Sequence, residues 1–203
     1  MTDPKSRVPT AEAYASAAWL LRCDVNAIRA VALIEAGVQG AFLPSGEPVI
    51  LFERHVFQRL SKGRFQGAAV PGTVGEKWRL VSWPNPGGYG PYSVQPQRLQ
   101  AAAALDRDAA LKSASWGLFQ IMGENHAACG YPELQRFITA MYRSVDDHLR
   151  AFVQFIRHDA RLVDAIRSKD WRTFARIYNG PAFESHNYDG RLAEAFAKLS
   201  ADD

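Results

Sequence analysis

Apolar residues recur at helical spacing near the start of the chain. Residues 10–22 carry an apolar face behind Thr10, a residue that favours the first position of a helix. A second run, residues 26–36, has the same spacing behind Asp24. Gly37 follows it and supplies the positive φ expected just past a helix end. The pattern therefore predicts two consecutive helices, the second ending at about Gly37.

The same periodicity returns in the second half of the chain. It predicts helices over 97–112, 114–122, 133–142, 145–157, 160–168, 170–178 and 188–199. Ser144, followed three residues later by Asp147, is a helix-start signal for one of them. A mainly helical fold follows.

A different pattern separates these two helical regions. Residues 41–43 and 48–52 predict the strands of a small hairpin around a Pro/Gly turn, and a short helix is expected from 54 to about 61. Residues 63–96 contain seven glycines and five prolines, so we expect a long functional loop there. The fold class is α+β, mainly α, with one small β-hairpin beside the helix that ends near Gly37.

Length and composition fit a single domain over residues 1–203, with residues 1–9 flexible. The net charge is +3 and the Lys and Arg residues are scattered, so no nucleic-acid partner is indicated. Cys23 and Cys129 are far apart and are expected to be buried thiols without a disulfide. No signal peptide or membrane helix is evident, so we expect no stable membrane insertion.

Glu35 is the side chain in these helices with the most unusual position. A carboxylate in a last helical turn meets the negative end of the helix dipole, and an apolar flank raises its pKa further. A carboxyl group that stays protonated near neutral pH can act as a general acid. The alternative is that Glu35 simply points into water, as most such residues do.

Four motifs, in order along the chain, carry a family resemblance. They are the helix-terminal Glu35, the L-F-E-R-H-V-F stretch at 51–57, S-W-G-L-F-Q-I-M-G-E-N-H at 115–126, and Y-N-G at 178–180. Together they resemble the lysozyme-like superfamily, which includes goose-type lysozymes and soluble lytic transglycosylases. The stretches 51–57 and 115–126 are similar to the N-acetylmuramidase family of phage endolysins. The resemblance covers about residues 27–197.

The resemblance implies a lysozyme-like fold and a peptidoglycan muramidase that cuts the MurNAc–GlcNAc β-1,4 bond. It implies Glu35 as the acid, and no cofactor. For a second carboxylate we favour Glu53 over Glu47, because Glu53 lies next to His55 and matches the family's F-E-x-H motif, whereas Glu47 lies in a turn. The alternative for Glu53 is a structural role. The histidines form no H-E-x-x-H pattern, so no metal site is expected.

Further site residues follow from the same motifs. By resemblance, Ser115, Gly117 and Gln120 line the floor of the sugar cleft, and Tyr178 and Asn179 face the catalytic glutamate. Their alternatives are a buried helix and an ordinary helix end. Four aromatic residues are candidates for stacking on sugars, or anchors of the loop: Trp78, Trp83, Tyr89 and Tyr92. Of these, we predict that Trp78 and Tyr89 bind substrate. His55 and His126 are expected to orient the site by hydrogen bonds.

Two other functions remain open from the sequence. A lytic transglycosylase uses one glutamate and releases 1,6-anhydro products from the same substrate. A non-catalytic glycan-binding or phage structural protein is the second alternative. As a muramidase, the protein is expected to be a monomer that binds peptidoglycan glycan strands. It is made in the bacterial cytoplasm and acts in the periplasm after release or delivery.

Overall fold

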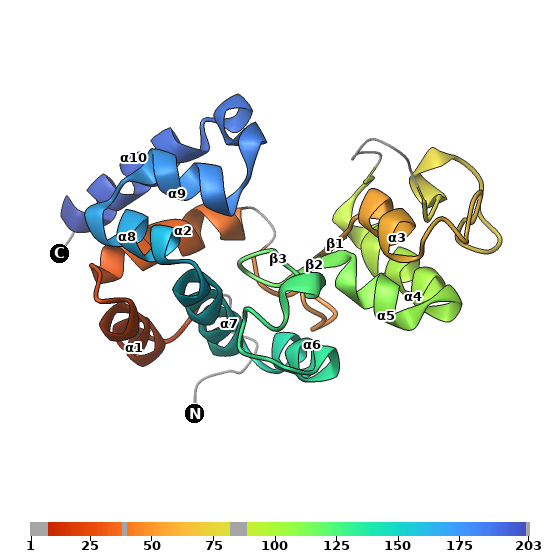
Figure 1. Cartoon of the computed structure of the whole chain (residues 1–203), viewed down its shortest axis with the longest axis horizontal. Coiled ribbons are helices and arrows are strands. Elements are labelled where there is room, and N and C mark those ends of the chain that lie inside the picture. Colours follow the sequence, from red (N-terminus) through yellow and green to blue (C-terminus); the bar gives the residue numbers. More distant parts are fainter. Residues whose placement is uncertain (1–7, 38–39, 82–88, 202–203) are drawn as a thin grey trace.

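The computed structural model describes residues 8–37, 40–81 and 89–201. Two lobes flank a small central sheet (Figure 1). Helices α1, α2 and α7–α10 build one lobe, and α3–α5 build the other. The mainly helical α+β class predicted from the sequence is confirmed.

The larger lobe is made of helices from both ends of the chain. They are α1 (Ala11–Leu21), α2 (Val25–Ala36), α7 (Val145–His158), α8 (Ala160–Ser168), α9 (Trp171–Tyr178) and α10 (Tyr188–Ala201). The predicted starts of α1 and α2 are confirmed, since Thr10 Oγ1 accepts from the Ala13 amide at 3.1 Å and Asp24 from the Asn26 amide at 2.9 Å. α10 packs along α2, whose apolar residues such as Val31 are buried in the core.

The smaller lobe holds the Gly/Pro-rich segment. It comprises α3 (Arg54–Leu60), α4 (Gln95–Leu105), α5 (Arg107–Lys112) and two short 3₁₀ helices, Glu76–Trp78 and Tyr92–Val94. The described residues of 63–96 are otherwise mostly turns and irregular chain, as expected. The single helix predicted over 97–112 is wrong. It breaks at Asp106, whose extended backbone ends α4 and whose side chain caps α5 by accepting from the Ala109 amide.

The central sheet corrects two further predictions. Its antiparallel order is β1 (Ile50–Phe52), β2 (Ala114–Trp116) and β3 (Ile121–Met122). The helix predicted over 114–122 is therefore wrong: these residues form two strands joined by a tight turn. The predicted hairpin near 41–52 survives only as the bridge between Phe42 and Pro48, because β1 pairs with β2 instead.

The remaining described elements join the sheet to the larger lobe. They are the 3₁₀ helix Gly123–Asn125 and α6 (Leu134–Arg143); a further 3₁₀ helix, Pro181–His186, joins α9 to α10 within the larger lobe. Cys23 and Cys129 are free thiols; Cys129 is buried, as predicted, but Cys23 is only partly buried, so the prediction is wrong for Cys23. Across residues 8–37, 40–81 and 89–201, no helix has both the length and the apolar character needed to span a bilayer.

Candidate active site

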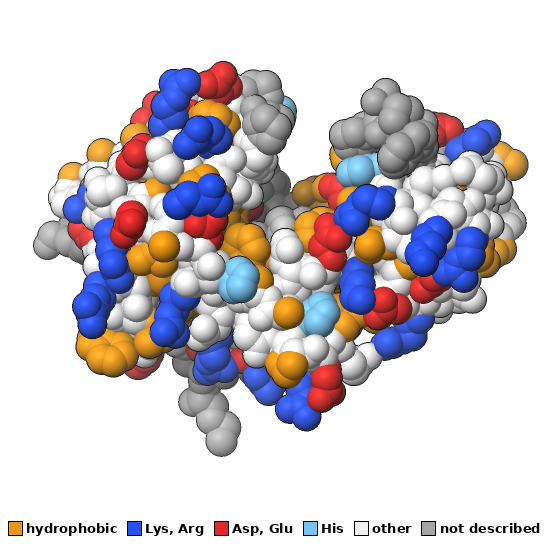
Figure 2. Space-filling model, viewed as in Figure 1, with side chains coloured by type: hydrophobic (Ala, Val, Ile, Leu, Met, Phe, Trp, Pro, Cys, Tyr) orange, Lys and Arg blue, Asp and Glu red, His pale blue; other side chains and the backbone are white. Residues whose placement is uncertain are grey.

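The molecular surface is hollowed between the two lobes (Figure 2). α2 runs up to the edge of this hollow, close to the central sheet (Figure 1). At the C-terminal end of α2 lies a pocket of about 260 Å³ whose walls come from α2, the 40–49 segment, the β2–β3 turn and the smaller lobe. Its lining residues are Glu35, Ala36, Gly37, Gly40, Val49, Tyr92 and Gln120.

Glu35 is the only ionisable carboxyl group among those lining residues. Burial raises its pKa to about 7, although the Tyr188 hydroxyl and the charge of Arg191 both act to lower it. Glu35 as a whole is partly exposed, and it lines the pocket. A carboxyl with this pKa is protonated below neutral pH and can donate a proton to a bound molecule.

Tyr188 is a site residue that the sequence reasoning missed. It begins α10, is 4 % exposed, and its hydroxyl donates to Glu35 Oε1. The two residues are 153 positions apart, so no local motif links them. Only the packing of α10 along α2 brings them together.

The β2–β3 turn brings the predicted cleft-floor residues to the same place. Gln120 Oε1 accepts from Ser115 Oγ at 2.9 Å, and Gln120 Nε2 donates to the Gly117 carbonyl at 2.7 Å. Gly117 and Gln120 both have positive φ, +68° and +46°, and for Gln120 this backbone conformation is unusual. The turn thus holds Gln120 against the Glu35 pocket with both ends of its amide occupied.

Glu53 lies where β1 passes into α3. Its Oε2 accepts from the Tyr89 hydroxyl at 2.8 Å, and His55 Nδ1 lies 3.3 Å from the same oxygen without hydrogen-bond geometry. Burial raises the pKa of Glu53 above its ordinary value, while the Tyr89 hydrogen bond and His55 act to lower it. The Tyr89 hydroxyl therefore holds the carboxyl, whereas the hydrogen bond predicted for His55 is not made by its Nδ1. The burial of Glu53 opposes the ionised form.

A buried pair from α4 fixes Tyr89 and β1 together. Gln95 Nε2 donates to the Tyr89 carbonyl at 2.6 Å, and Gln95 Oε1 accepts from the Phe52 amide at 3.2 Å. Arg98 Nη1 also donates to the Tyr89 carbonyl, at 2.9 Å. Gln95 and Arg98 are fully buried, so the backbone of Tyr89 is held by two side chains that are themselves packed in the protein. No motif in the sequence indicates this pair.

The other aromatic candidates have mixed surroundings. Tyr92 lines the Glu35 pocket, whereas Trp78 packs against the core of the protein. Tyr178 is partly buried among other aromatic rings, and its hydroxyl donates to the Phe119 carbonyl at 2.8 Å. Asn179 is exposed at the end of α9. Trp83 lies outside the described residues.

His126 takes part in a local turn. Its Nδ1 donates to the Tyr131 carbonyl at 2.7 Å, and the Tyr131 amide donates back to the His126 carbonyl. These contacts fix the chain that follows β3. The prediction that His126 orients the glutamates stays a prediction.

Larger hollows lie elsewhere on the molecule. One of about 420 Å³ lies between α1 and α7, and one of about 680 Å³ lies beside α4. Neither is lined by Glu35 or Glu53, so the smaller pocket is the better candidate on chemical grounds. Within the described ranges, no group of three or more His, Cys, Asp or Glu side chains is placed to hold a metal ion.

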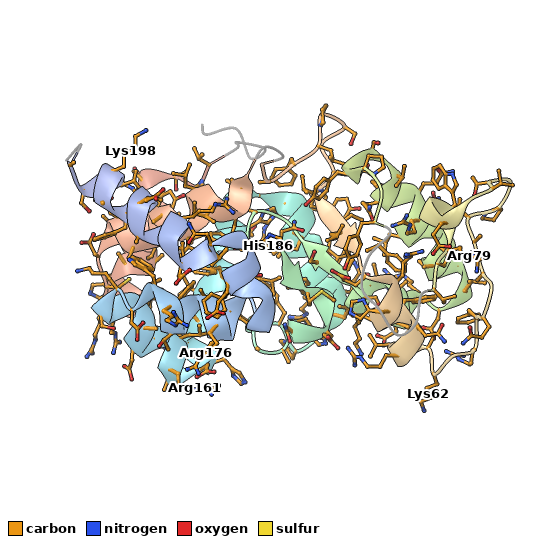
Figure 3. All side chains as sticks on the ribbon, turned by 90° about the horizontal axis from the view of Figure 1, so that it is seen from above. Lys62, Arg79, Arg161, Arg176, His186 and Lys198 are labelled. Atoms are coloured by element: carbon orange, nitrogen blue, oxygen red, sulfur yellow. The ribbon has the colours of Figure 1, made fainter. Side chains whose placement is uncertain are left out.

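The positive charges are dispersed over the molecule. Seen from above, Lys62 and Arg79 lie at the end formed by the smaller lobe and Lys198 at the opposite end (Figure 3). Arg161 and Arg176 lie along one edge between them.

Comparison with known proteins gives a consistent result. A family model described as muramidase, N-acetylmuramidase, matches residues 24–200. The crystal structure of the Burkholderia AP3 phage endolysin is similar with a TM-score of 0.83 and 38% sequence identity, over 100% of this chain and 74% of that one. No curated protein is similar enough to count as a match.

Proposed function

The chain belongs to the N-acetylmuramidase family, and on that premise we propose that Glu35 is its general acid and Glu53 its second carboxylate. As a family member the protein is a peptidoglycan-degrading muramidase, a glycoside hydrolase of the kind found in phage endolysins. The proposal concerns the bond that is cut, MurNAc–GlcNAc β-1,4, and the residues that cut it.

The observation that carries the proposal is the environment of Glu35. Glycosidic cleavage needs an acid that protonates the leaving oxygen. A carboxyl with an ordinary pKa of 4.5 is almost fully ionised at neutral pH, whereas one with a pKa of about 7 is half protonated there. Glu35 meets this requirement in a pocket that is open to a ligand.

Glu53 suits the role of a base that activates water. Burial raises the pKa of Glu53, while the hydrogen bond from the Tyr89 hydroxyl and the neighbouring His55 favour the charged form. Val49 lines the Glu35 pocket, and the four residues from there to Glu53 span at most about 13 Å of extended chain. This length is compatible both with the inverting arrangement, in which roughly 6.5–9.5 Å between carboxyls leaves room for water, and with the retaining one at roughly 5–5.5 Å.

The first test is Glu35→Gln in a turbidity assay on Gram-negative cells stripped of their outer membrane. The amide keeps the size of the side chain and cannot donate a proton to the leaving oxygen. We expect lysis to fall about 10²- to 10⁴-fold, the usual range for general acid catalysis. Glu47→Gln, in the turn of the 40–49 segment, is the matched control and should keep wild-type activity. A folded Glu35→Gln protein with more than about a tenth of wild-type activity would refute the assignment.

The second test is product analysis of Glu53→Gln on purified peptidoglycan. Hydrolysis leaves reducing ends, and a base is needed to make them; the variant should lose most hydrolysis while still binding glycan. If it stays active and mass spectrometry finds 1,6-anhydro ends, the transglycosylase alternative is correct, because that reaction uses the sugar's own 6-hydroxyl as nucleophile. Unbroken glycan in both variants, together with activity in the wild type, supports the two-carboxylate mechanism.

We further propose that the enzyme works as a monomer on peptidoglycan glycan strands, without a nucleic-acid partner. The dispersed cations of Figure 3 support the second statement. Synthesis in the cytoplasm followed by release to the periplasm fits an endolysin. Size-exclusion chromatography with light scattering tests the monomer; a dimer mass at micromolar concentration would contradict it.

A further inference from the structure

The turn between β2 and β3 forms one wall of the Glu35 pocket, and its shape is not one the backbone adopts freely. It runs from Gly117 to Gln120, and both of these residues have positive φ. The non-glycine member of the pair, Gln120, is the residue that lines the pocket beside Glu35. Contacts from outside the turn must therefore select this conformation over more ordinary ones.

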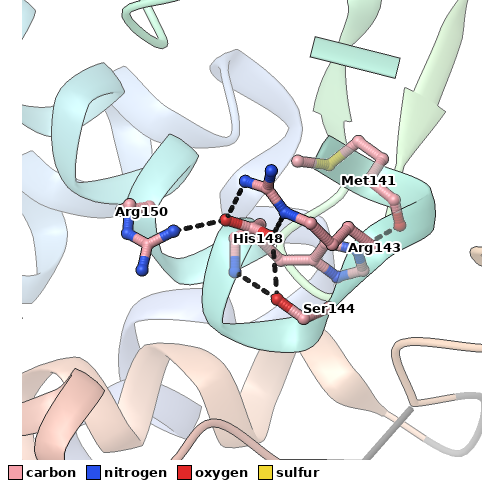
Figure 4. A network of polar contacts seen from close by, with 6 residues as sticks. Met141, Arg143, Ser144, His148 and Arg150 are labelled. Atoms are coloured by element: carbon pink, nitrogen blue, oxygen red, sulfur yellow. Dashed lines mark hydrogen bonds and ion pairs between the residues drawn. The ribbon is translucent and has the colours of Figure 1, made fainter. Parts of the chain in front are cut away.

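His148, which is outside the turn, supplies such a contact. It lies in the first turn and a half of α7 and is 1 % exposed. Its Nδ1 accepts from the Leu118 amide at 3.0 Å. Its Nε2 contacts the Met141 carbonyl at 2.7 Å (Figure 4). An amide only donates and a carbonyl only accepts, so the imidazole is neutral and carries its proton on Nε2.

The ring also fits the turn sterically. A Cβ on Gly117 would lie 2.6 Å from His148 Cε1, so the glycine allows the ring and the backbone to approach. The ring of Phe42, from the 40–49 segment, lies 5.1 Å from the imidazole centroid. One buried imidazole therefore contacts both chain segments that wall the pocket, 40–49 and 117–120.

The base of this imidazole is itself anchored. Asp147, the preceding residue, accepts from Arg143, Ser144 and Arg150 at the corner between α6 and α7 (Figure 4). Ser144 Oγ in turn caps α7 by accepting from the Asp147 amide at 3.2 Å. The corner fixes the first turn of α7 and so fixes the direction in which His148 points.

We propose that His148 is a positioning residue of the muramidase reaction: through the Leu118 amide it holds the 117–120 turn so that Gln120 faces the Glu35 pocket. It touches neither substrate nor Glu35. Without its Nδ1, the buried Leu118 amide loses its acceptor and the turn relaxes toward a conformation with less strain at Gln120. The inference rests on the proposed role of Glu35, since the pocket matters only if catalysis occurs there.

Two variants separate the two hydrogen bonds of the ring. In His148→Asn, Oδ1 stands as many bonds from the backbone as Nδ1 and can accept from the Leu118 amide. In His148→Gln, Nε2 occupies the corresponding place of the imidazole Nε2 and can donate to the Met141 carbonyl. We expect His148→Gln to lose roughly 10- to 100-fold in kcat on soluble peptidoglycan oligomers, the scale of a misplacement by about 1 Å, with little change in KM. His148→Asn should retain more of its kcat.

Two measurements distinguish a positioning role of His148 from a role in stability alone. Activity is measured well below the unfolding midpoint of each variant, and hydrogen exchange reports on the Leu118 amide. Exchange at Leu118 should be fast in His148→Gln and slow in His148→Asn. Equal kcat in the two variants, or losses that follow their unfolding midpoints instead of Leu118 protection, would overturn the proposal.

Two further measurements keep the result interpretable. If neither variant folds, ¹⁵N NMR of the wild-type ring decides: a proton on Nε2 and a free lone pair on Nδ1 support the proposal, and the opposite tautomer refutes it. Glu35→Gln is assayed in parallel. If that variant stays active the proposed acid is wrong, whereas the comparison of His148→Asn with His148→Gln still tests the turn.

Discussion

The acidity of Glu35 is a balance between three residue-level effects. Burial raises its pKa, and this effect is the largest; the Tyr188 hydroxyl and the charge of Arg191 oppose it. The pKa of about 7 is therefore a compromise that leaves the carboxyl protonated in mildly acidic conditions and ionisable above them. If Glu35 is the acid, the Tyr188 hydrogen bond lowers the upper pH limit of the enzyme.

Tyr188→Phe tests this balance. The variant removes a hydrogen bond that stabilises the carboxylate, so the pKa of Glu35 should rise and the basic limb of the kcat/KM profile should move to higher pH. Tyr14→Phe is a suitable control, since Tyr14 is also buried but its ring contacts Arg29 in another part of the lobe. An unmoved basic limb in Tyr188→Phe would show that the limb belongs to another group.

At this scale the sequence predicted the group and missed its partner. Glu35 was identifiable because a helix end, an apolar flank and Gly37 are all local signals. Tyr188 was not, because nothing near it in the sequence indicates a carboxylate 153 residues away. Tyr178 was predicted to face Glu35; its hydroxyl donates to the Phe119 carbonyl, and after burial the charge of Glu35 is the next influence that raises the pKa of Tyr178.

The elements were predicted well where periodicity is long and poorly where it is short. α6 to α10 begin and end within a few residues of the expected ranges, because each repeats the helical pattern over two or more turns. Residues 114–122 failed because four apolar residues at 118, 119, 121 and 122 also suit a helix. The feature that decides against it, a positive φ at Gln120, is imposed by tertiary contacts and leaves no trace in the pattern.

The Gly/Pro-rich segment gives a prediction about element function. Tyr92 lines the Glu35 pocket and Trp78 packs against the core, so the two aromatics should respond differently to removal. Tyr92→Ala should raise KM for glycan roughly threefold to tenfold through loss of a stacking surface. Trp78→Ala should mainly lower the unfolding midpoint.

Steady-state kinetics on soluble oligomers and thermal unfolding measure the two effects. Tyr89→Phe joins the set, because it removes the hydroxyl that donates to Glu53 and keeps the ring. Unchanged KM in all three variants would mean that this segment only closes the fold and takes no part in binding glycan.

The free energy of unfolding of the whole molecule should depend on pH through Glu35. Its carboxyl has a pKa of about 7 when folded and an ordinary one near 4.5 when unfolded, so the folded state binds the extra proton between these values. The free energy of unfolding therefore falls as pH rises from about 4.5 to 7 and then levels off.

Glu35→Gln lacks this dependence and should be the more stable protein above pH 7, by about 1–3 kcal/mol. Urea titrations of both proteins at several pH values measure the difference, and the other carboxylates cancel in the comparison. A difference that stays constant from pH 4.5 to 8 would contradict the shifted pKa.

The docking of α10 on α2 has a consequence for the order of events during synthesis. Glu35 is synthesised early, whereas Tyr188, whose hydroxyl donates to it, is added 153 residues later. A nascent chain that has folded α2 and its neighbours therefore still lacks the Tyr188 hydrogen bond to the Glu35 carboxyl. A chain that ends before Tyr188 lacks α10 and its packing along α2, so we expect such a fragment to have no lytic activity.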